Sequence, residues 1–337
     1  MIAQLLSALI FLVSLWLILS EKVNRTIIGL FGAALMVVLG KLLHFYDEQQ
    51  VVSVVDFNTL GLLLGMMILV ALLEPTGFFQ FLAVWAGRLS RGKPILLLVL
   101  LGTVTTLVSM FLDNVTTVVL IAPVTILICE ILGIQPTPYL IAEALLSNTG
   151  GTATLVGDPP NILIASAAGF TFVDFLTHSL PVVLFTWLAA LWLLRHLFRH
   201  ELAVQPPNAG VVLQLNPRET LDDPVTTRKV LIILGVAIVF FFFEDALKIS
   251  PAFIALSAAA GALLWIRPDM QDILKRIEWS VLVFFASLFV IVGGLEASGV
   301  LGYIVSQLEL LKSIPPVLFG LIRSEERRVG KECRSRW

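Results

Sequence analysis

The residues best suited to chemistry in this sequence begin with an acid in an apolar setting. Residues 109–117 read SMFLDNVTT, and long apolar runs flank Asp113 on both sides. A carboxylate inside a lipid bilayer costs several kcal/mol unless it pairs or faces water, so such an acid indicates a functional site. Polar residues that satisfy free backbone groups at a hairpin tip explain Asn114 well, but they explain Asp113 poorly. Ser109 precedes Asp113 by four residues, so on one helix the two side chains would share a face.

A second polar segment, residues 147–161, reads SNTGGTATLVGDPPN between two apolar stretches. Gly150 and Gly151 are predicted to break a helix, and Pro159–Pro160 prevent its regular continuation. Unwound backbone exposes carbonyls to a cation, while amides at a new helix start near 159–162 face an anion. A loop at the membrane surface is the alternative, but the close apolar flanks favour a break inside the membrane. Neutral oxygens that suit a hard cation are supplied by Ser147, Asn148, Thr149, Thr152 and Thr154.

Two further acids lie in or beside this segment. Asp158 caps the restarted helix, coordinates a cation or carries a proton, and the sequence leaves these roles open. Glu143 precedes Ser147 by four residues and either reaches the same cavity or is an ordinary buried carboxyl. The two cysteines and four histidines have no spacing typical of a disulfide framework or a metal site.

Composition explains why acids are notable here. The 337 residues are 58% hydrophobic and only 14% charged, against about a quarter charged in soluble domains. Apolar runs of about 20 residues span a bilayer, and several occur. We therefore expect an all-α polytopic membrane protein, and the net charge of −2 indicates no nucleic-acid partner. The predicted spans are 2–20, 25–43, 57–74, 178–198, 229–247, 251–266 and 279–296.

Charge asymmetry predicts the orientation of these spans. Basic residues mark cytoplasmic loops, and all basic loops fall on one side only if 94–130 enters and leaves the membrane as a re-entrant hairpin. A broken helix over 138–170 and the helix at 178–198 then complete a first repeat, 1–198. The N-terminus is predicted outside, and the polar linker 199–228 is predicted to be cytoplasmic.

An internal repeat supports a transporter architecture. DFNTLGLLLGMMILVALLEPTG at 56–77 is similar to EWSVLVFFASLFVIVGGLEASG at 278–299 with a constant offset. The first unit contains five crossings and a hairpin, and an odd number of crossings inverts the second copy in the membrane. We therefore predict an inverted-repeat fold whose second repeat, 229–322, is partial.

The last fifteen residues, RSEERRVGKECRSRW at 323–337, break with the rest of the chain. Nine of them are charged, directly after an apolar stretch. The string is similar to the translation of a common sequencing adapter, whereas a native basic tail is the plainer alternative. We expect a non-native tail and a second repeat that is truncated.

The two polar motifs resemble those of the ion transporter superfamily, ArsB/NhaD branch, whose members are P-protein-like with a citrate-transporter-like domain. The resemblance rests on SMFLDNVTTVVLIAP at 109–123 and SNTGGTATLVGDPPNILIASAAG at 147–169. It implies a first cation or substrate site lined by Ser109, Asp113, Asn114, Gly150, Gly151 and Thr152, with Na⁺ at Ser109, Asp113, Asn114 and Gly151. Related divalent-anion symporters carry Ser-Asn-Thr where this chain has Asp113-Asn114-Val115. That departure argues against a simple citrate or succinate symporter and suits cation–proton exchange or a proton-coupled anion carrier.

These observations predict a secondary active transporter of the cell (inner or plasma) membrane rather than an enzyme. It would move an inorganic or organic anion, such as an arsenite-type substrate, or exchange Na⁺ for H⁺, with no cofactor besides the coupling ion. An ion channel of the same fold and an intramembrane enzyme using Asp113 and Asp158 are the alternatives. The expected partners are the small ion, the lipid bilayer and, by resemblance, a second copy in a homodimer. The predicted ion-binding residues are Ser109, Asp113, Asn114, Thr117, Ser147, Asn148, Thr149, Gly150, Gly151, Thr152, Asp158 and Asn161.

Overall fold

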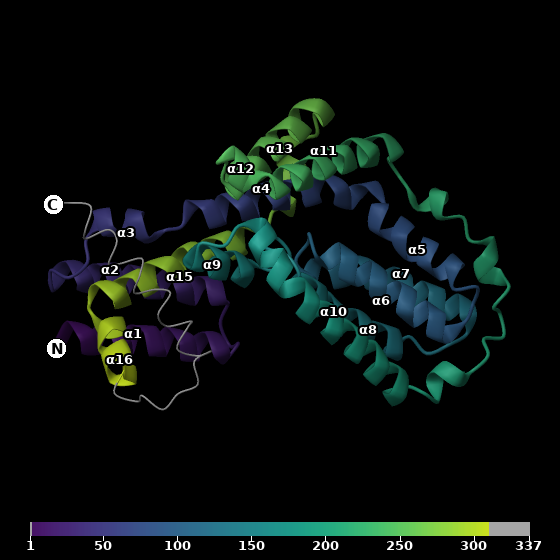
Figure 1. Ribbon diagram of the computed structural model, residues 1–337, viewed down its shortest axis with the longest axis horizontal. Coiled ribbons are helices and arrows are strands. Elements are labelled where there is room, and N and C mark those ends of the chain that lie inside the picture. Colours follow the sequence, from purple (N-terminus) through teal and green to yellow (C-terminus); the bar gives the residue numbers. More distant parts are fainter. Residues whose placement is uncertain (1, 310–337) are drawn as a thin grey trace. The chain divides into compact units, whose positions relative to one another are not determined.

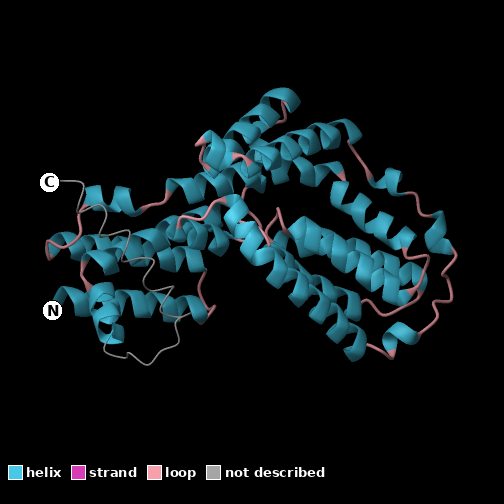
Figure 2. Cartoon of the chain, viewed as in Figure 1, coloured by secondary structure: helices cyan, strands magenta, loops and turns pink. Residues whose placement is uncertain are grey.

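The computed structural model describes residues 2–309, and within them every regular element is a helix (Figure 2). Seven of these helices are long and apolar enough to cross a membrane, which confirms the predicted all-α polytopic membrane protein. Residues 310–322 of the predicted second repeat and the tail at 323–337 lie outside the described residues. The main helices are α1 (Ile2–Leu19), α2 (Arg25–Leu42), α4 (Phe57–Leu73), α5 (Phe78–Leu89), α6 (Pro94–Ser109), α7 (Asn114–Leu132), α8 (Thr137–Gly151), α9 (Pro159–Ala168), α10 (Phe172–Leu197), α11 (Pro224–Phe242), α13 (Pro251–Ile266) and α15 (Trp279–Ala297).

Short elements connect these helices. They are α3 (Glu48–Val54), η1 (Glu74–Thr76), η2 (Glu201–Ala203), η3 (Val211–Gln214), η4 (Pro217–Thr220), α12 (Glu244–Leu247), α14 (Met270–Arg276) and α16 (Val300–Glu309).

Two helices begin earlier than hydropathy predicted. α10 starts at Phe172 rather than 178, because Thr171 and Asp174 form a capping box at its N-terminus. α11 starts at Pro224 rather than 229, because Asp223 caps it and proline is favoured in the first helical turn. Polar capping residues hide such starts from a hydropathy pattern.

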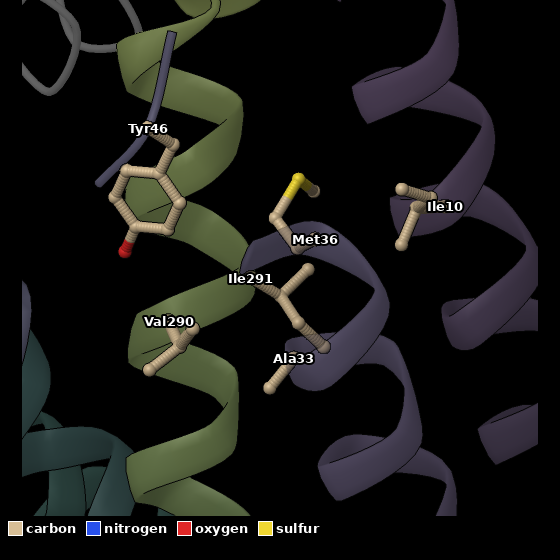
Figure 3. Packing of buried hydrophobic residues seen from close by; sticks show 6 residues of the cluster. All are labelled: Ile10, Ala33, Met36, Tyr46, Val290 and Ile291. Atoms are coloured by element: carbon tan, nitrogen blue, oxygen red, sulfur yellow. The ribbon is translucent and has the colours of Figure 1, made fainter. Parts of the chain in front are cut away.

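The described chain divides into two packed units, and the first combines residues 2–60 with 278–309. Its core lies where α1, α2 and α15 meet, and Figure 3 shows the buried cluster. Met36 and Tyr46 are almost fully buried there. Gly29 of α2 faces Ser287 of α15, where an added Cβ would lie 3.2 Å from the serine Cβ. Small residues thus let these two helices approach closely.

The second unit, residues 61–277, holds both polar motifs. Within it α8 packs against α6, α7 and α10 (Figure 1). Gly102 of α6 faces Leu146 of α8, and Thr106 faces Gly150 one turn further along both helices. α6 and α8 therefore run parallel, and their polar C-terminal ends lie at the same level.

The linker at 199–228 is a packed segment with three short 3-10 turns. Its Val212 and Leu202 side chains are buried, and its turns contact α5, α6 and α7. It also approaches glycine turns closely: an added Cβ at Gly92 would lie 2.7 Å from the Ala209 Cβ. The linker is therefore fixed against the ends of these helices, and its side of the membrane stays a prediction.

The two copies of the internal repeat start and end alike, although the first finishes in the 3-10 turn η1 and the second stays α-helical to Ala297. α4 begins at Phe57 and α15 at Trp279, the equivalent positions in the alignment. The glycines that end the copies, Gly77 and Gly299, have φ values of 78° and 81°, a left-handed conformation that favours glycine. The inversion of the second copy stays a prediction.

Candidate ion-binding site

The first polar motif forms the turn between α6 and α7. α6 ends at Ser109 and α7 begins at Asn114, so Ser109 and Asp113 lie on opposite sides of a turn. The prediction that these two share one helix face is therefore wrong. Asp113 is the N-cap of α7, and its Oδ1 accepts hydrogen bonds from the backbone N–H of Val115 (2.9 Å) and Thr116 (3.0 Å). The carboxylate thus stabilises a helix start, where a negative charge is favoured.

The end of α6 is bonded directly to α8. Ser109 is fully buried, and its hydroxyl donates to the carbonyl of Ser147 at 2.8 Å. One turn earlier, the Thr106 hydroxyl donates to Gly102 O at 2.7 Å and lies 3.3 Å from Leu146 O. Buried hydroxyls therefore tie the two parallel helices together just before both chains leave helical geometry.

The second motif interrupts a helix, but later than predicted. α8 continues through Gly151, and the irregular segment is 152–158, so the prediction that Gly150 and Gly151 break the helix is wrong. Gly150 has a packing role instead, since an added Cβ would lie 2.9 Å from the Thr106 carbonyl carbon. Glycine in this position allows backbone contact between α6 and α8.

Asn161 and Thr154 hold the irregular segment in place. The Asn161 side-chain amide donates to the carbonyls of Gly151 and Thr154, both at 2.8 Å. The Thr154 hydroxyl donates to Met110 O in the α6–α7 turn and accepts the Gly157 N–H at 3.2 Å. These bonds satisfy backbone groups that the break leaves without helical partners. They also join the helix break to the hairpin turn.

The start of α9 is a poor anion site, contrary to expectation. Pro159 and Pro160 lack an N–H, and the Asn161 N–H is bonded to Asp158 O at 3.0 Å. Helix starts bind anions through free N–H groups, and this first turn has lost three of them. The start of α9 therefore offers fewer anion-facing amides than expected for 159–162.

Two carboxylates meet at this junction. Asp158 occupies the N-cap position of α9, yet its side chain makes no capping hydrogen bond, so its predicted capping role is not found. A Cβ added to Gly151 would lie 3.6 Å from Ser109 Oγ and 3.7 Å from Asp158 Cβ, which places these three residues around one spot. Within residues 2–309, neither acid forms an ion pair with a basic side chain.

The remaining predicted residues differ in their surroundings. The Asn114 amide donates to the Asn148 side-chain oxygen, which joins the hairpin to α8. The Thr117 hydroxyl is buried and donates to Asp113 O at 2.9 Å. Thr149 and Thr152 instead donate to carbonyls of their own helix end, so their hydroxyls do not join the hairpin.

Sequence reasoning missed other residues that shape the junction. Gly157 packs its backbone against Gly151 and Ser109, with 2.6 Å from an added Cβ to either carbonyl oxygen. Ser179 of α10 donates to Ala153 O at 2.7 Å. The spacing of the small residues Gly102, Thr106 and Ser109 could have predicted which face of α6 packs on another helix, because small residues mark close helix contacts.

The junction is rich in oxygen atoms. It offers carboxylates, hydroxyls and carbonyls, the oxygen ligands that hard cations accept. Ser109, Asp113, Asn114 and Gly151, the predicted Na⁺ ligands, all lie on the paired ends of the hairpin and α8. No group of three or more His, Cys, Asp or Glu side chains that could hold a metal ion occurs in the part of the chain described.

Interrupted helices within the membrane are typical of secondary transporters. Comparison with known proteins agrees with this class: the sequence profile of the citrate transporter family matches residues 15–323. The chain therefore belongs to the citrate transporter family, and the predicted ion-transporter resemblance is confirmed.

Several relatives align with most of this chain. An uncharacterized transporter of Mycobacterium tuberculosis is 41% identical over 300 residues, which cover 88% of this chain and 69% of the relative. The 46 kDa membrane protein of Mycobacterium leprae is 41% identical over 294 residues, covering 86% and 68%. The human P protein is 32% identical over an alignment of 373 residues, covering 89% of this chain and 44% of its own length.

Proposed function

We propose that this protein is a secondary active transporter that moves a small ion by alternating access, coupled to H⁺ or Na⁺. The observation that carries the proposal is the junction of Asp113 and Asp158. Asp113 starts α7 and Asp158 lies beside Gly151 and Ser109, and neither acid pairs with a basic side chain within residues 2–309, so a cation or a proton is needed beside them.

The two acids differ in what binding would cost them. Asp113 already accepts two backbone N–H bonds, so its charge also stabilises α7. Asp158 accepts no capping bond, so its oxygens are available without loss of a structural contact. We infer that the bound ion neutralises the pair and that Ser109 and Gly151 contribute neutral oxygens. Binding would then favour a conformation in which hairpin and break stay together, as alternating access requires.

The transported substrate is a separate question. The family description names citrate, while three backbone positions at the start of α9 have no free N–H for an anion. We therefore assign the cation or proton to this junction and leave an organic anion, an arsenite-type anion or Na⁺ as the transported species. A cell-membrane location, an external N-terminus, a cytoplasmic linker and a homodimer belong to the same proposal.

The test is flux in liposomes that contain the protein from the complete reading frame. Imposed pH or Na⁺ gradients should drive accumulation of one member of a panel of citrate, arsenite and sodium. Asp113→Asn should abolish the gradient-driven accumulation while the protein stays folded, because asparagine also caps helices well. Flux without coupling would indicate a channel, lipid turnover without ion movement would indicate an enzyme, and unchanged coupling in Asp113→Asn would remove this acid from the mechanism.

A further inference from the structure

Glu143 is a buried acid outside the junction of Asp113 and Asp158. It lies in α8 and has no exposed surface. Its Oε1 accepts a hydrogen bond from the Thr125 hydroxyl of α7, which is also fully buried. Its other oxygen, Oε2, is buried and has no hydrogen-bond partner. Buried polar atoms without partners are rare in native proteins and often mark functional groups.

No charge in the packed helices compensates Glu143. α6 contains no ionisable residue, and α7 offers only the buried thiol of Cys129 and the exposed Glu130. On α8 itself, Tyr139 donates to Pro94 O at 3.4 Å. The ionisable residues of α10 are exposed and near its ends, namely Asp174, His178, Arg195 and His196. An ionised Glu143 would therefore be an unpaired buried charge, which proteins avoid by binding a proton.

The position of Glu143 relates it to the ion site. It precedes Ser147 by one helical turn, and Ser147 O accepts the Ser109 hydroxyl. At 1.5 Å per residue, Glu143 lies about 12 Å along α8 from Gly151. Thr125 comes from α7, the helix that Asp113 caps. α8 and α7 thus connect this carboxyl to both halves of the junction, while the Glu143 side chain itself is fully buried.

We propose that Glu143 is a second proton-binding site, which is neutral while α7 and α8 are packed and releases its proton when they separate. The inference rests on the proposed function, because it adds a second proton site to that transporter besides the junction. In the packed state the carboxyl keeps its proton and the Thr125 bond. Separation of the two helices admits water, which accepts the proton and solvates the carboxylate. Protonation and packing of α7 on α8 are therefore linked equilibria.

The experiment compares Glu143→Gln with a matched control, Glu130→Gln, in the protein from the complete reading frame. Glutamine has the shape of the neutral acid but cannot release a proton. Infrared difference spectra on a pH change should show the carbonyl band of a protonated carboxylic acid in the wild type and in Glu130→Gln. Glu143→Gln should lack the component of that band that Glu143 contributes. The pH dependence of transport should flatten in Glu143→Gln, so that a one-unit pH gradient no longer supports the roughly tenfold accumulation that one coupled proton allows.

The outcomes separate this inference from the proposed function. Proton-driven flux in the wild type with an unchanged pH profile and an unchanged infrared band in Glu143→Gln would overturn the inference and leave the transporter intact. Absence of coupled flux in the wild type would overturn the proposed function, whereas the infrared band would still report the proton site. If Glu143→Gln does not fold, Thr125→Val removes the hydroxyl partner and keeps the acid. That variant should shift the pH at which the band appears, and an unshifted band would count against the proposal.

Discussion

Replacing Asn161 by alanine should loosen the helix break without touching either carboxylate. The Asn161 amide is 7% exposed and satisfies two carbonyls, Gly151 O and Thr154 O, each at 2.8 Å. A buried polar group left without its partner costs about 1–3 kcal/mol. Water that enters the space of the missing side chain offsets part of this cost, so we expect a loss of about 2–4 kcal/mol for the pair.

Thermal unfolding of purified protein in detergent measures this loss. At this chain length 1 kcal/mol corresponds to about 2 °C in Tm, so Asn161→Ala should lower Tm by roughly 4–8 °C. Asn208→Ala is the matched control, because Asn208 is an exposed asparagine of the linker. A Tm for Asn161→Ala within about 1 °C of that control would refute the assignment of Asn161 as the clamp of the break.

Two further predictions concern other positions of the same unit. Gly150→Ala should lower the free energy of unfolding by about 1–3 kcal/mol, because the new Cβ meets the Thr106 backbone. Gly235 has open space around it, so the control Gly235→Ala should be neutral or stabilising by up to about 1 kcal/mol. Equal Tm values for both variants would contradict the close packing of α6 on α8. Asp223→Ala should cost about 1 kcal/mol by removing the cap of α11. The Thr226 hydroxyl and then its backbone N–H lower the pKa of the Asp223 carboxyl, so its contribution is present above the ordinary value of 3.8 and is lost as pH falls through the lowered pKa. Unfolding curves of wild type and variant should converge in strong acid, and a constant difference at all pH values would contradict this linkage.

Hydropathy predicted the spans because membrane helices must satisfy every backbone group internally. α1, α2 and α15 begin where the apolar runs begin. The method missed the first turn of α10 because a capping box of polar residues starts it. Such polar caps look like loop in a hydropathy pattern although they are the strongest local signals of a helix start.

The polar motifs were located correctly as positions of interruption, but their inner geometry depends on tertiary packing. Two adjacent glycines look like a helix break in sequence, yet α8 runs through both because Gly150 packs on α6. The spacing of Ser109 and Asp113 resembled one helix face, yet Asp113 starts the next helix. The first outcome depends on which helix lies opposite, whereas the second follows from the local role of Asp113 as an N-cap, which the spacing argument did not consider.

The acids also have features that the sequence predicted and features that only packing determines. Sequence alone marked Asp113 as costly in a membrane, and its capping bonds explain part of that cost. It left Glu143 with two interpretations, and only packing places it against Thr125 with one oxygen unpaired. The loss of two amides at the start of α9 was readable from Pro159 and Pro160, which cannot donate hydrogen bonds.

The measurement that tests the central claim most directly is coupled flux in Asp158→Asn. The control is Asp272→Asn, because Asp272 is an exposed acid of α14 paired with Lys275 at 3.5 Å. Both proteins should be reconstituted at equal density, with uptake driven by a pH gradient and then by a Na⁺ gradient. The account predicts that Asp158→Asn loses accumulation driven by the gradient of the coupling ion, whereas Asp272→Asn accumulates substrate as the wild type does. Wild-type accumulation in Asp158→Asn under both gradients would contradict a coupling site at this junction.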